Sequence, residues 1–332
     1  MTVTVEDIRT AAGRIAALAK NTPVLHSRLF DEEAGGVECY FKCENLQRGG
    51  AFKIRGALNF LVALSPEERR RGVVTFSSGN HAQAVAMAAA HLNVAATIVM
   101  PTDTPQAKME STKAYKPKIV LFDRMKENRE EIAGRIAEET NAVVLPSYDH
   151  PWIVAGQGTA ALELLDETPD LDAIFAPLGG GGLLAGTAIA AQAHNPQIRV
   201  FGAEPEMASD WYQSLKAGER LAIPPPQTIA DGLRTPIPGE VTFPIVRELA
   251  AGVLLVSEDE IKAGVRFLLS RLKLLTEPSG AVAAAALLHK KVPTGIRKAG
   301  IILSGGNVDF DVLSEICRVS KPLENNSKPN GL

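Results

Sequence analysis

The sequence predicts an α/β fold with two open parallel-sheet domains, and three observations support this prediction. Short apolar runs alternate with helical stretches between residues 71 and 145, an order typical of a parallel sheet. A second alternating series follows between residues 174 and 303. Four consecutive glycines stand between a strand and a helix of that series. Because ligands of such sheets bind beyond the carboxyl ends of the strands, we expect a site in the cleft between the domains.

The individual elements follow from the periodicity of apolar residues. Residues 4–19 predict an amphipathic helix, since Ile8, Ala12 and Ile15 fall on one face. Each alternating series then supplies four strands. The expected strands are Val73–Phe76, Ala96–Met100, Ile119–Phe122 and Val143–Leu145, followed by Ile174–Ala176, Arg199–Gly202, Val253–Val256 and Ala299–Leu303.

The composition excludes several classes of partner. The chain has 332 residues, of which 22% are charged, and its net charge of −3 gives no electrostatic basis for binding nucleic acid or an anionic membrane. Glu6, Asp7 and Arg9 leave no apolar core for a secretory signal, and the alanine-rich runs are too short to span a bilayer. We therefore expect a cytoplasmic protein that binds neither nucleic acid nor membrane.

Lys53 is the first candidate for chemistry, because it lies where a solvent-facing charge is not expected. It follows the strand-like run Val37–Lys42 and a two-glycine turn, and it precedes a helical pattern. Between Phe52 and Ile54, partial desolvation would lower the pKa of the lysine and free the neutral amine that forms Schiff bases. On this segment alone, a lysine that reaches from a helix start to water is the alternative.

Two glycine-rich turns have the composition of an anion-binding cradle. Residues 173–190 run from a buried strand through four glycines, Gly179–Gly182, into a helix of small residues. Backbone N–H groups and the helix dipole favour a dianion at such a helix start. Residues 301–309 repeat the pattern, with Ser304 expected to be exposed at the end of the strand.

A fourth segment, residues 73–90, passes from a strand into a helix through Ser77, Ser78 and Asn80. We expect these polar side chains to cap the start of the helix, which is a natural place to hold a carboxylate. With Lys53 and the two glycine turns, this segment completes a pattern that a solvent-facing lysine does not explain.

A dinucleotide-binding site is the different-class alternative. Gly180, Gly182 and Ala185 satisfy the G-x-G-x-x-A fingerprint, and the next strand is followed by Glu204 at about the ribose-binding distance of ~20 residues. This pattern would indicate an NAD-dependent dehydrogenase. It explains neither Lys53 nor the serine–asparagine helix start nor the second glycine turn, so the combined pattern favours another cofactor.

Together these segments resemble the fold-type II family of pyridoxal-phosphate (PLP) enzymes, which share the fold of the tryptophan synthase β subunit. The branch that the chain resembles contains threonine dehydratases, serine racemases and 3-hydroxyaspartate dehydratases. The resemblance extends from about residue 22 to residue 309, with the motifs in family order. The matching segments are Glu44–Gln47, Phe52–Ala57, Ser77–His81, Ala155–Thr159, Gly179–Gly182, Ile229–Gly232, Glu277–Gly280 and Ser304–Asn307.

The resemblance implies a division of the chain into two domains with the cofactor in the cleft between them. Residues 1–70 and 148–320 would form a large, discontinuous PLP-binding domain. Residues 71–147 would form a small mobile domain, and residues 321–332 a polar tail. The resemblance also implies a homodimer.

The resemblance further implies roles at the cofactor. Lys53 would hold PLP as a Schiff base and, once the substrate displaces it, remove the Cα proton. Asn80 would bond the 3′-oxygen of PLP, and Ser304 the pyridine nitrogen. A hydroxyl at that nitrogen makes the ring a weaker electron sink, which suits elimination. The expected cofactor residues are Phe52, Lys53, Asn80, Gly179, Gly180, Gly181, Gly182, Gly232 and Ser304.

The substrate carboxylate is expected on the loop formed by Ser77, Ser78, Gly79 and His81. Ser78 also matches the opposite-face acid or base of serine racemases and is the second catalytic candidate, although dehydratases carry the same serine. Arg129 matches an arginine that faces the substrate in serine racemases. An arginine in the cleft favours a substrate with a second carboxylate.

A divalent cation is expected beside the second series of strands. Glu204 and Asp210 match two carboxylates that bind such a cation in the racemase and hydroxyaspartate branch, and Ala208 matches the backbone carbonyl ligand. Hard oxygen ligands of this kind suit Mg²⁺, Mn²⁺ or Ca²⁺. Without the resemblance, the segment would be interpreted as an acidic loop.

The resemblance implies a PLP-dependent ammonia-lyase, or dehydratase, that acts on a small β-hydroxy α-amino acid. We expect 3-hydroxyaspartate as the first substrate, with oxaloacetate and ammonia as products. Serine and threonine are the further substrates expected at the same site. Serine racemase is the alternative activity of this site, and an NAD-dependent dehydrogenase remains the alternative from a different class.

Overall fold

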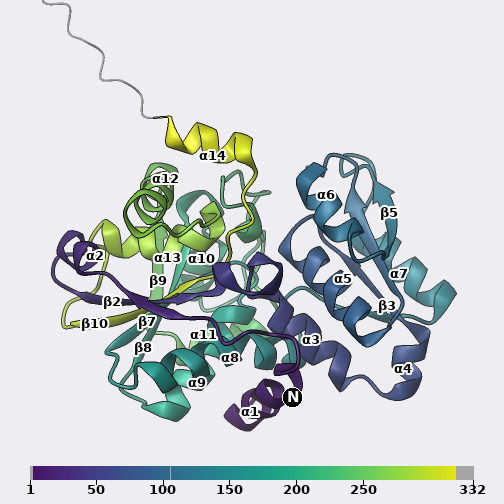
Figure 1. The fold of residues 1–332 in the computed structure, drawn as a ribbon, viewed down its shortest axis with the longest axis horizontal. Helices are drawn as coiled ribbons and strands as arrows, with labels where there is room; N and C mark the ends of the chain where they lie inside the picture. Colours follow the sequence, from purple (N-terminus) through teal and green to yellow (C-terminus); the bar gives the residue numbers. More distant parts are fainter. Residues whose placement is uncertain (1–2, 105, 319–332) are drawn as a thin grey trace, which may run out of the picture.

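The computed structural model describes residues 3–104 and 106–318, which form two sheets side by side (Figure 1). We call residues 73–144, without residue 105, the small unit, and the other described residues, 3–72 and 145–318, the large unit. All eight expected strands are present, with ends that differ by up to three residues. The polar tail expected at residues 321–332 lies outside the described residues.

The sheet of the large unit has six strands in the order β1-β2-β10-β7-β8-β9. Their bounds are β1 Val24–His26, β2 Glu38–Cys43, β7 Ala173–Pro177, β8 Arg199–Pro205, β9 Gly252–Val256 and β10 Lys298–Leu303. β1 pairs antiparallel with β2, and every other pairing is parallel. β10 and β7 are neighbours although about 120 residues separate them in sequence, so the turns that follow these two strands meet at one edge of the sheet.

The sheet of the small unit has four parallel strands in the order β5-β4-β3-β6. Their bounds are β3 Val73–Phe76, β4 Ala96–Pro101, β5 Lys118–Phe122 and β6 Val143–Val144. Side chains of β4 alternate between two helical layers: Ile98 and Met100 pack with helix α5, and Val99 packs with helix α7. The chain leaves β3 at the point where the strand order reverses, which is where ligands bind in open sheets.

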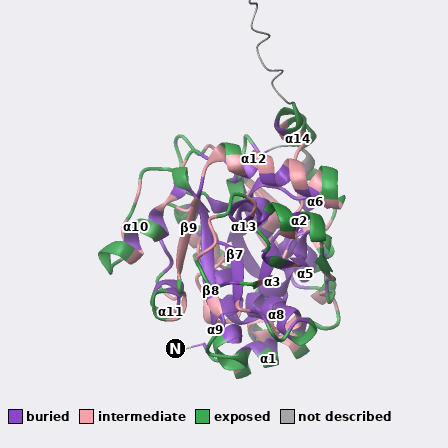
Figure 2. Cartoon of the chain, turned by 90° about the vertical axis from the view of Figure 1, so that its left-hand side faces the viewer, coloured by how far each residue is buried: buried purple, intermediate pink, exposed green. Residues whose placement is uncertain are grey.

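The described helices cover both sheets. They are α1 Val5–Ile15, α2 Arg28–Glu33, α3 Lys53–Ala63, α4 Pro66–Arg71, α5 Asn80–Leu92, α6 Gln106–Lys113, α7 Arg129–Thr140, α8 Pro151–Glu167, α9 Gly182–His194, α10 Asp210–Ala217, α11 Thr242–Leu249, α12 Glu258–Phe267, α13 Pro278–Leu288 and α14 Phe310–Cys317. α13 packs against β7, β8 and β10, and its alanines allow close approach to the sheet. Figure 2 shows α13, β7 and β8 as the buried centre of the large unit.

Helix α3 links the two units. It packs on α8 of the large unit and on α5 of the small unit, and it lies between the two sheets in Figure 1. Residues 54–61 of this helix are all buried. A helix that is buried on all sides needs an apolar sequence, and the run from Ala57 to Ala63 is apolar except at Asn59. The Asn59 amide donates to the Trp152 carbonyl (2.7 Å), which satisfies this buried polar group.

Two local expectations differ from the structure. The N-terminal helix ends at Ile15 rather than at residue 19, because the chain turns at residues 16–18. Strand β1 was not expected, since three residues with no apolar alternation give no recognisable sequence signal. Among the described residues, no helix is long and apolar enough to cross a bilayer.

Candidate active site

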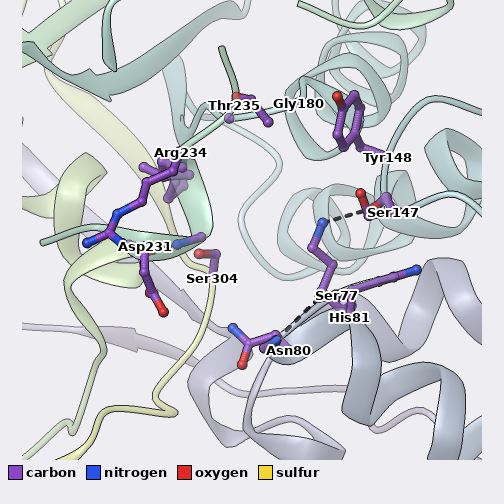
Figure 3. Close-up of a pocket in the computed structure, with 18 of the residues that line it drawn as sticks. Ser77, Asn80, His81, Ser147, Tyr148, Gly180, Asp231, Arg234, Thr235 and Ser304 are labelled. Carbon is purple, nitrogen blue, oxygen red and sulfur yellow. Dashed lines mark hydrogen bonds between the residues drawn. The ribbon is translucent and has the colours of Figure 1, made fainter. Parts of the chain in front are cut away.

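A pocket lies where the carboxyl ends of strands from both units face each other. Figure 3 shows Ser77, Asn80 and His81 of the small unit on one side, and Asp231, Arg234 and Ser304 of the large unit on the other. The pocket is lined by Phe52, Lys53, Phe76, Ser77, Ser78, Gly79, Asn80, His81, Lys108, Arg129, Ser147, Tyr148, Pro177, Gly179, Gly180, Gly181, Gly182, Leu183, Asp231, Gly232, Leu233, Arg234, Thr235, Glu277, Ser279 and Ser304. It therefore brings together every cofactor and substrate residue expected from the sequence.

Lys53 is the first residue of α3 and points its ammonium into this pocket. Nζ donates to the Ser147 carbonyl at 3.0 Å and lies 5.0 Å from the centre of the Phe52 ring. Burial lowers the pKa of Lys53 to about 8, against the opposing charge of Glu277. A large fraction of the amine is therefore neutral near pH 8, as a nucleophile or proton acceptor requires.

The glycine turn after β7 is held by two side chains of the large unit. The Trp211 indole N–H donates to the Gly179 carbonyl, and the Thr242 hydroxyl donates to the Gly180 carbonyl at 2.8 Å. Gly181 has φ 90°, which favours glycine. A Cβ at Gly180 would overlap the ring of Tyr148. The turn consequently has no room for side chains, and its backbone lines the pocket.

The first turn of α9 begins at this glycine turn, at Gly182. The first N–H groups of a helix have no acceptor within the helix, and the dipole places partial positive charge there. The pocket wall is thus suited to a dianion such as a phosphate ester. This is the physical fit that a phosphate-bearing cofactor requires.

The loop after β3 forms the opposing wall. The expected side-chain cap is absent: Gly79 is the N-cap residue of α5 and no side chain accepts from the first turn. The Ser77 hydroxyl instead accepts from the Gly79 N–H (3.3 Å). Because Gly79 carries no side-chain oxygen, the helix start stays open to an anion from the pocket, which leaves it better suited to a substrate carboxylate than a capped helix.

His81 and Asn80 are both held by protein partners. His81 Nε2 lies 3.0 Å from the Thr75 hydroxyl, and burial, with the nearby Lys53, lowers the pKa of His81 to about 3. Its ring is therefore neutral and directed toward the small sheet. The Asn80 amide donates to Glu277 Oε1 at 2.6 Å and its oxygen accepts from Asn307 (2.8 Å).

Ser304 follows β10 and is buried, whereas the sequence analysis expected it to be exposed. Only 5% of the residue is exposed, because Glu277 and the following glycines pack around the turn. Its carbonyl accepts from the Phe52 N–H at 3.1 Å, which ties the Ser304 turn to the residue before Lys53. Ser304 still lines the pocket, on the opposite side of it from Tyr148 (Figure 3).

Arg129 lies at the start of α7, with its guanidinium 5.2 Å from the centre of the Phe76 ring. It lines the pocket, and among the described residues it has no ion pair and no hydrogen bond from its guanidinium. An arginine with five unused donors at a pocket wall can bind a carboxylate in a bidentate way.

Glu204 and Asp210 are not among the residues that line this pocket. Both are buried, and Glu204 Oε2 and both Asp210 carboxylate oxygens have no hydrogen-bond partner in the described structure. Burial raises the pKa of Glu204 to about 9 and that of Asp210 to about 7. Buried carboxylates without partners are costly, and a divalent cation would satisfy them. The position of Glu204 also shows that it is not a ribose ligand of the pocket.

Several residues of the pocket had no role in the sequence analysis. Glu277 and Asp231 stand inside the matching motifs but were not singled out. Burial and Asp231 raise the pKa of Glu277 to about 8, which disfavours the charged form of this carboxyl. Tyr148 and Lys108 come from segments without a motif, and no local pattern could have identified them.

Comparison with known proteins agrees with this geometry. A family model described as pyridoxal-phosphate dependent enzyme matches residues 15–305. The chain is 48% identical to the L-threo-3-hydroxyaspartate ammonia-lyase of Saccharomyces cerevisiae, over 92% of this chain and 93% of that protein. It is 46% identical to the serine racemase of Schizosaccharomyces pombe, over 93% and 95%.

A solved structure shows the same fold. The structure of maize serine racemase superposes with a TM-score of 0.91 at 43% identity, and the match covers 95% of this chain and 97% of that one. The family match spans both sheets and the pocket between them, and it excludes the dehydrogenase alternative. The chain belongs to the family of pyridoxal-phosphate-dependent enzymes.

Proposed function

We propose that the protein is an ammonia-lyase that converts 3-hydroxyaspartate to oxaloacetate and ammonia. The observation that carries the choice of substrate is the unpaired Arg129 guanidinium at the pocket wall. A second carboxylate on the substrate supplies its partner, whereas the side chains of serine and threonine do not. Relatives named L-threo-3-hydroxyaspartate ammonia-lyase, at 46–48% identity, support the same choice.

Different residues of the pocket would bind the phosphate, the ring nitrogen and the ring face of PLP. PLP, when bound, withdraws electrons from the Cα of an attached amino acid. The open first turn of α9 and the backbone of Gly179–Gly182 hold the phosphate. Ser304, Asn80 and Gly232 line the same pocket; the Ser304 hydroxyl would bind the pyridine nitrogen, and Asn80 the 3′-oxygen. Phe52 supplies an apolar face beside Lys53.

Lys53 Nζ takes the proton from the Cα of the substrate. Its lowered pKa, about 8, makes the neutral amine available near neutral pH without a further base. The open start of α5, with Ser77, Ser78 and Gly79, binds the α-carboxylate, and His81 supports this loop through Thr75. Arg129 binds the second carboxylate and so orients the β-hydroxyl for departure as water.

Serine racemase is the second candidate, and Ser78 is compatible with it as well as with the lyase. Ser78 lines the small-unit wall of the pocket, and in a racemase its hydroxyl would return a proton to Cα. Racemase relatives are almost as similar to this chain as the lyases. A racemase returns the proton to Cα and leaves the amino acid chemically intact, whereas a lyase releases ammonia.

One assay separates these activities. Ammonia release is measured across serine, threonine and the four stereoisomers of 3-hydroxyaspartate, with chiral analysis of the remaining substrate. We expect the largest kcat/KM for one hydroxyaspartate stereoisomer, with 2-oxo acid formed in equal amount to ammonia. Racemised serine with little ammonia would support the racemase instead.

We also propose a divalent cation, Mg²⁺, Mn²⁺ or Ca²⁺, bound by Glu204, Asp210 and the Ala208 carbonyl. The support is the pair of buried carboxylates whose oxygens lack partners. Trp211 directly follows Asp210 and its indole donates to the Gly179 carbonyl. The cation would therefore also stabilise the turn that holds the phosphate.

A homodimer, a cytoplasmic location and the division into domains at residues 71–147 complete the proposal. Support for a dimer comes from exposed apolar side chains of the large unit, among them Leu46, Leu275 and Phe310. Sedimentation analysis of the purified protein tests the dimer, and cell fractionation tests the location.

A further inference from the structure

A single ion pair crosses the mouth of the pocket. The Lys108 ammonium, on helix α6 of the small unit, contacts the Asp231 carboxylate of the large unit, 123 residues away in sequence. Both residues line the pocket. Within residues 3–104 and 106–318, this is the one ion pair that joins the small unit to the large unit.

The pair connects two elements that carry the walls of the pocket. Asp231 begins a turn, Asp231–Leu233, whose Gly232 N–H donates to the Ser279 hydroxyl (2.9 Å). A Cβ at Gly179 would lie 3.2 Å from the Gly232 carbonyl, so this turn packs on the glycine turn. On the other side, α6 packs on α5, the helix that begins at the substrate loop.

The other polar contacts between the units are of a different kind. Away from the two points where the chain passes between the units, at which Leu145 bonds to Val74 and Thr75 and Val143 bonds to Gly72, they include bonds of Asn80 to Glu277 (2.6 Å) and of Asn307 to Asn80 (2.8 Å) and Gln83 (3.3 Å). They are hydrogen bonds from uncharged amide groups, and burial raises the pKa of Glu277 to about 8, which disfavours its charged form. Among the described residues, the Lys108–Asp231 pair is the contact between the units in which an ammonium meets a carboxylate directly, and attraction between full charges acts over a longer distance.

The environment keeps Lys108 charged. Its side chain is 16% exposed and that of Asp231 is 39% exposed. Burial disfavours the ammonium, but Asp231, Glu277 and Asp309 raise the pKa of Lys108 above its usual value. At neutral pH the pair is therefore formed by an ammonium and a carboxylate.

We propose that Lys108 and Asp231 are positioning residues that hold the two units closed over the pocket. Separation of the units would widen the access of substrate to Lys53, and the pair would reform when the units close. Closure brings the Ser77–Asn80 loop to its working distance from Lys53 and excludes water. This inference rests on the proposed division into two domains and not on the identity of the substrate.

Hydrogen–deuterium exchange of the PLP-loaded protein without substrate tests the proposal. The variants are Lys108→Met, Asp231→Asn and the charge swap Lys108→Asp with Asp231→Lys. The control is Lys298→Met, which breaks the Lys298–Asp170 pair within the large unit. We expect each single variant to raise exchange at residues 77–83 and 229–235 by about two- to fivefold, the range for a partly exposed pair. The swap should restore slow exchange, and the control should not change it.

Salt and kinetics give two further readouts. Because ions screen exposed charges, 1 M NaCl should raise exchange at these segments in the unmodified protein and not in the single variants. The single variants should lower kcat by a similar factor for serine and hydroxyaspartate. Exchange unchanged in the single variants, or raised equally in the charge swap, would overturn the proposal. A failure of hydroxyaspartate turnover in the unmodified protein would count against the proposed substrate alone.

Discussion

Lys53 and Arg55 lie two residues apart on helix α3, and their surroundings are opposite. The Arg55 guanidinium is fully buried and forms charged hydrogen bonds to Glu44 (2.7 and 2.8 Å) and Glu163 (2.6 and 2.7 Å). Among the described residues, the Lys53 ammonium has one hydrogen bond, to the neutral carbonyl of Ser147. One cation is thus compensated and the other is not.

The two surroundings move the pKa values in opposite directions. Burial alone would lower the pKa of Arg55, but Glu44 and Glu163 raise it above its usual range. Burial would raise the pKa of Glu44, and Arg55 holds it below its usual value. At Lys53 burial dominates and lowers the pKa to about 8. The same helix therefore carries a charge that fixes its position and an amine that is free to react.

The largest expected effect is the loss of activity in Lys53→Ala. This change removes the covalent attachment of the cofactor and the proton acceptor together, so kcat should fall by more than about 10⁴-fold. The melting temperature without PLP should hardly change, because Lys53 has no compensating partner to lose. Substantial residual turnover by this variant would show that another group takes the Cα proton.

Arg55→Met should have the converse effect. It removes the ion-pair partner of the fully buried Glu44, while Lys42 remains paired with Glu163, and breaking such a buried pair costs about 3–5 kcal/mol of folding free energy. Urea unfolding of the PLP-free protein measures the loss, and Lys298→Met, at an exposed pair, is the control with a much smaller change. An Arg55→Met protein of unchanged stability would mean that the network is not what holds α3.

Arg129→Ala tests a pocket arginine whose guanidinium has neither an ion pair nor a hydrogen bond among the described residues. Removing a guanidinium that binds a second carboxylate should cost about 2–4 kcal/mol in kcat/KM for hydroxyaspartate, roughly 30- to 1,000-fold. Turnover of serine and threonine should change much less. Arg124→Ala, whose guanidinium pairs with Asp103 at the surface, is the matched control. An equal loss for all substrates would assign Arg129 a structural role.

Glu204 and Asp210 form a second place where buried ionisable groups have no ion-pair partner among the described residues. We expect removal of the proposed cation to lower the stability of the protein. Their pKa values are raised to about 9 and about 7 from 4.5 and 3.8. The folded protein then binds more protons than the unfolded one, so its stability falls as pH rises from about 4 to 9. EDTA should lower the melting temperature at pH 8 by at least about 3 °C and Mg²⁺ should restore it. Indifference of Asp210→Asn and of the unmodified protein to both treatments would argue against a cation.

The sequence predicted those features that a short segment determines. The strands, the glycine turn and the position of Lys53 at a helix start all follow from local patterns, and the structure confirms them. The expected cap at Ser77 was wrong, because Gly79 occupies the N-cap position. Ser304 was expected to be exposed and is buried.

Contacts between distant segments could not be predicted. The hydrogen bond of Asn80 to Glu277 joins residues 197 apart, and the Lys108–Asp231 pair joins residues 123 apart. Their partners depend on how the two sheets face each other, which periodicity does not specify. Among the described residues Lys53 has no ion pair, and the sequence could not predict this either. It depends on whether any surrounding segment places a carboxylate next to the ammonium.

The difference between Lys53 and the compensated cations can be measured directly by pH-dependent labelling. PLP-free protein is treated with pyridoxal and borohydride from pH 6 to 11, and peptide mapping gives the rate of labelling at each lysine. We expect Lys53 to react fastest, with a midpoint near pH 8, and the buried Lys42, paired with Glu163, to stay unlabelled. A midpoint near 10.5 at Lys53, or preferential labelling of another lysine, would contradict the role of Lys53 as the reactive amine of the pocket.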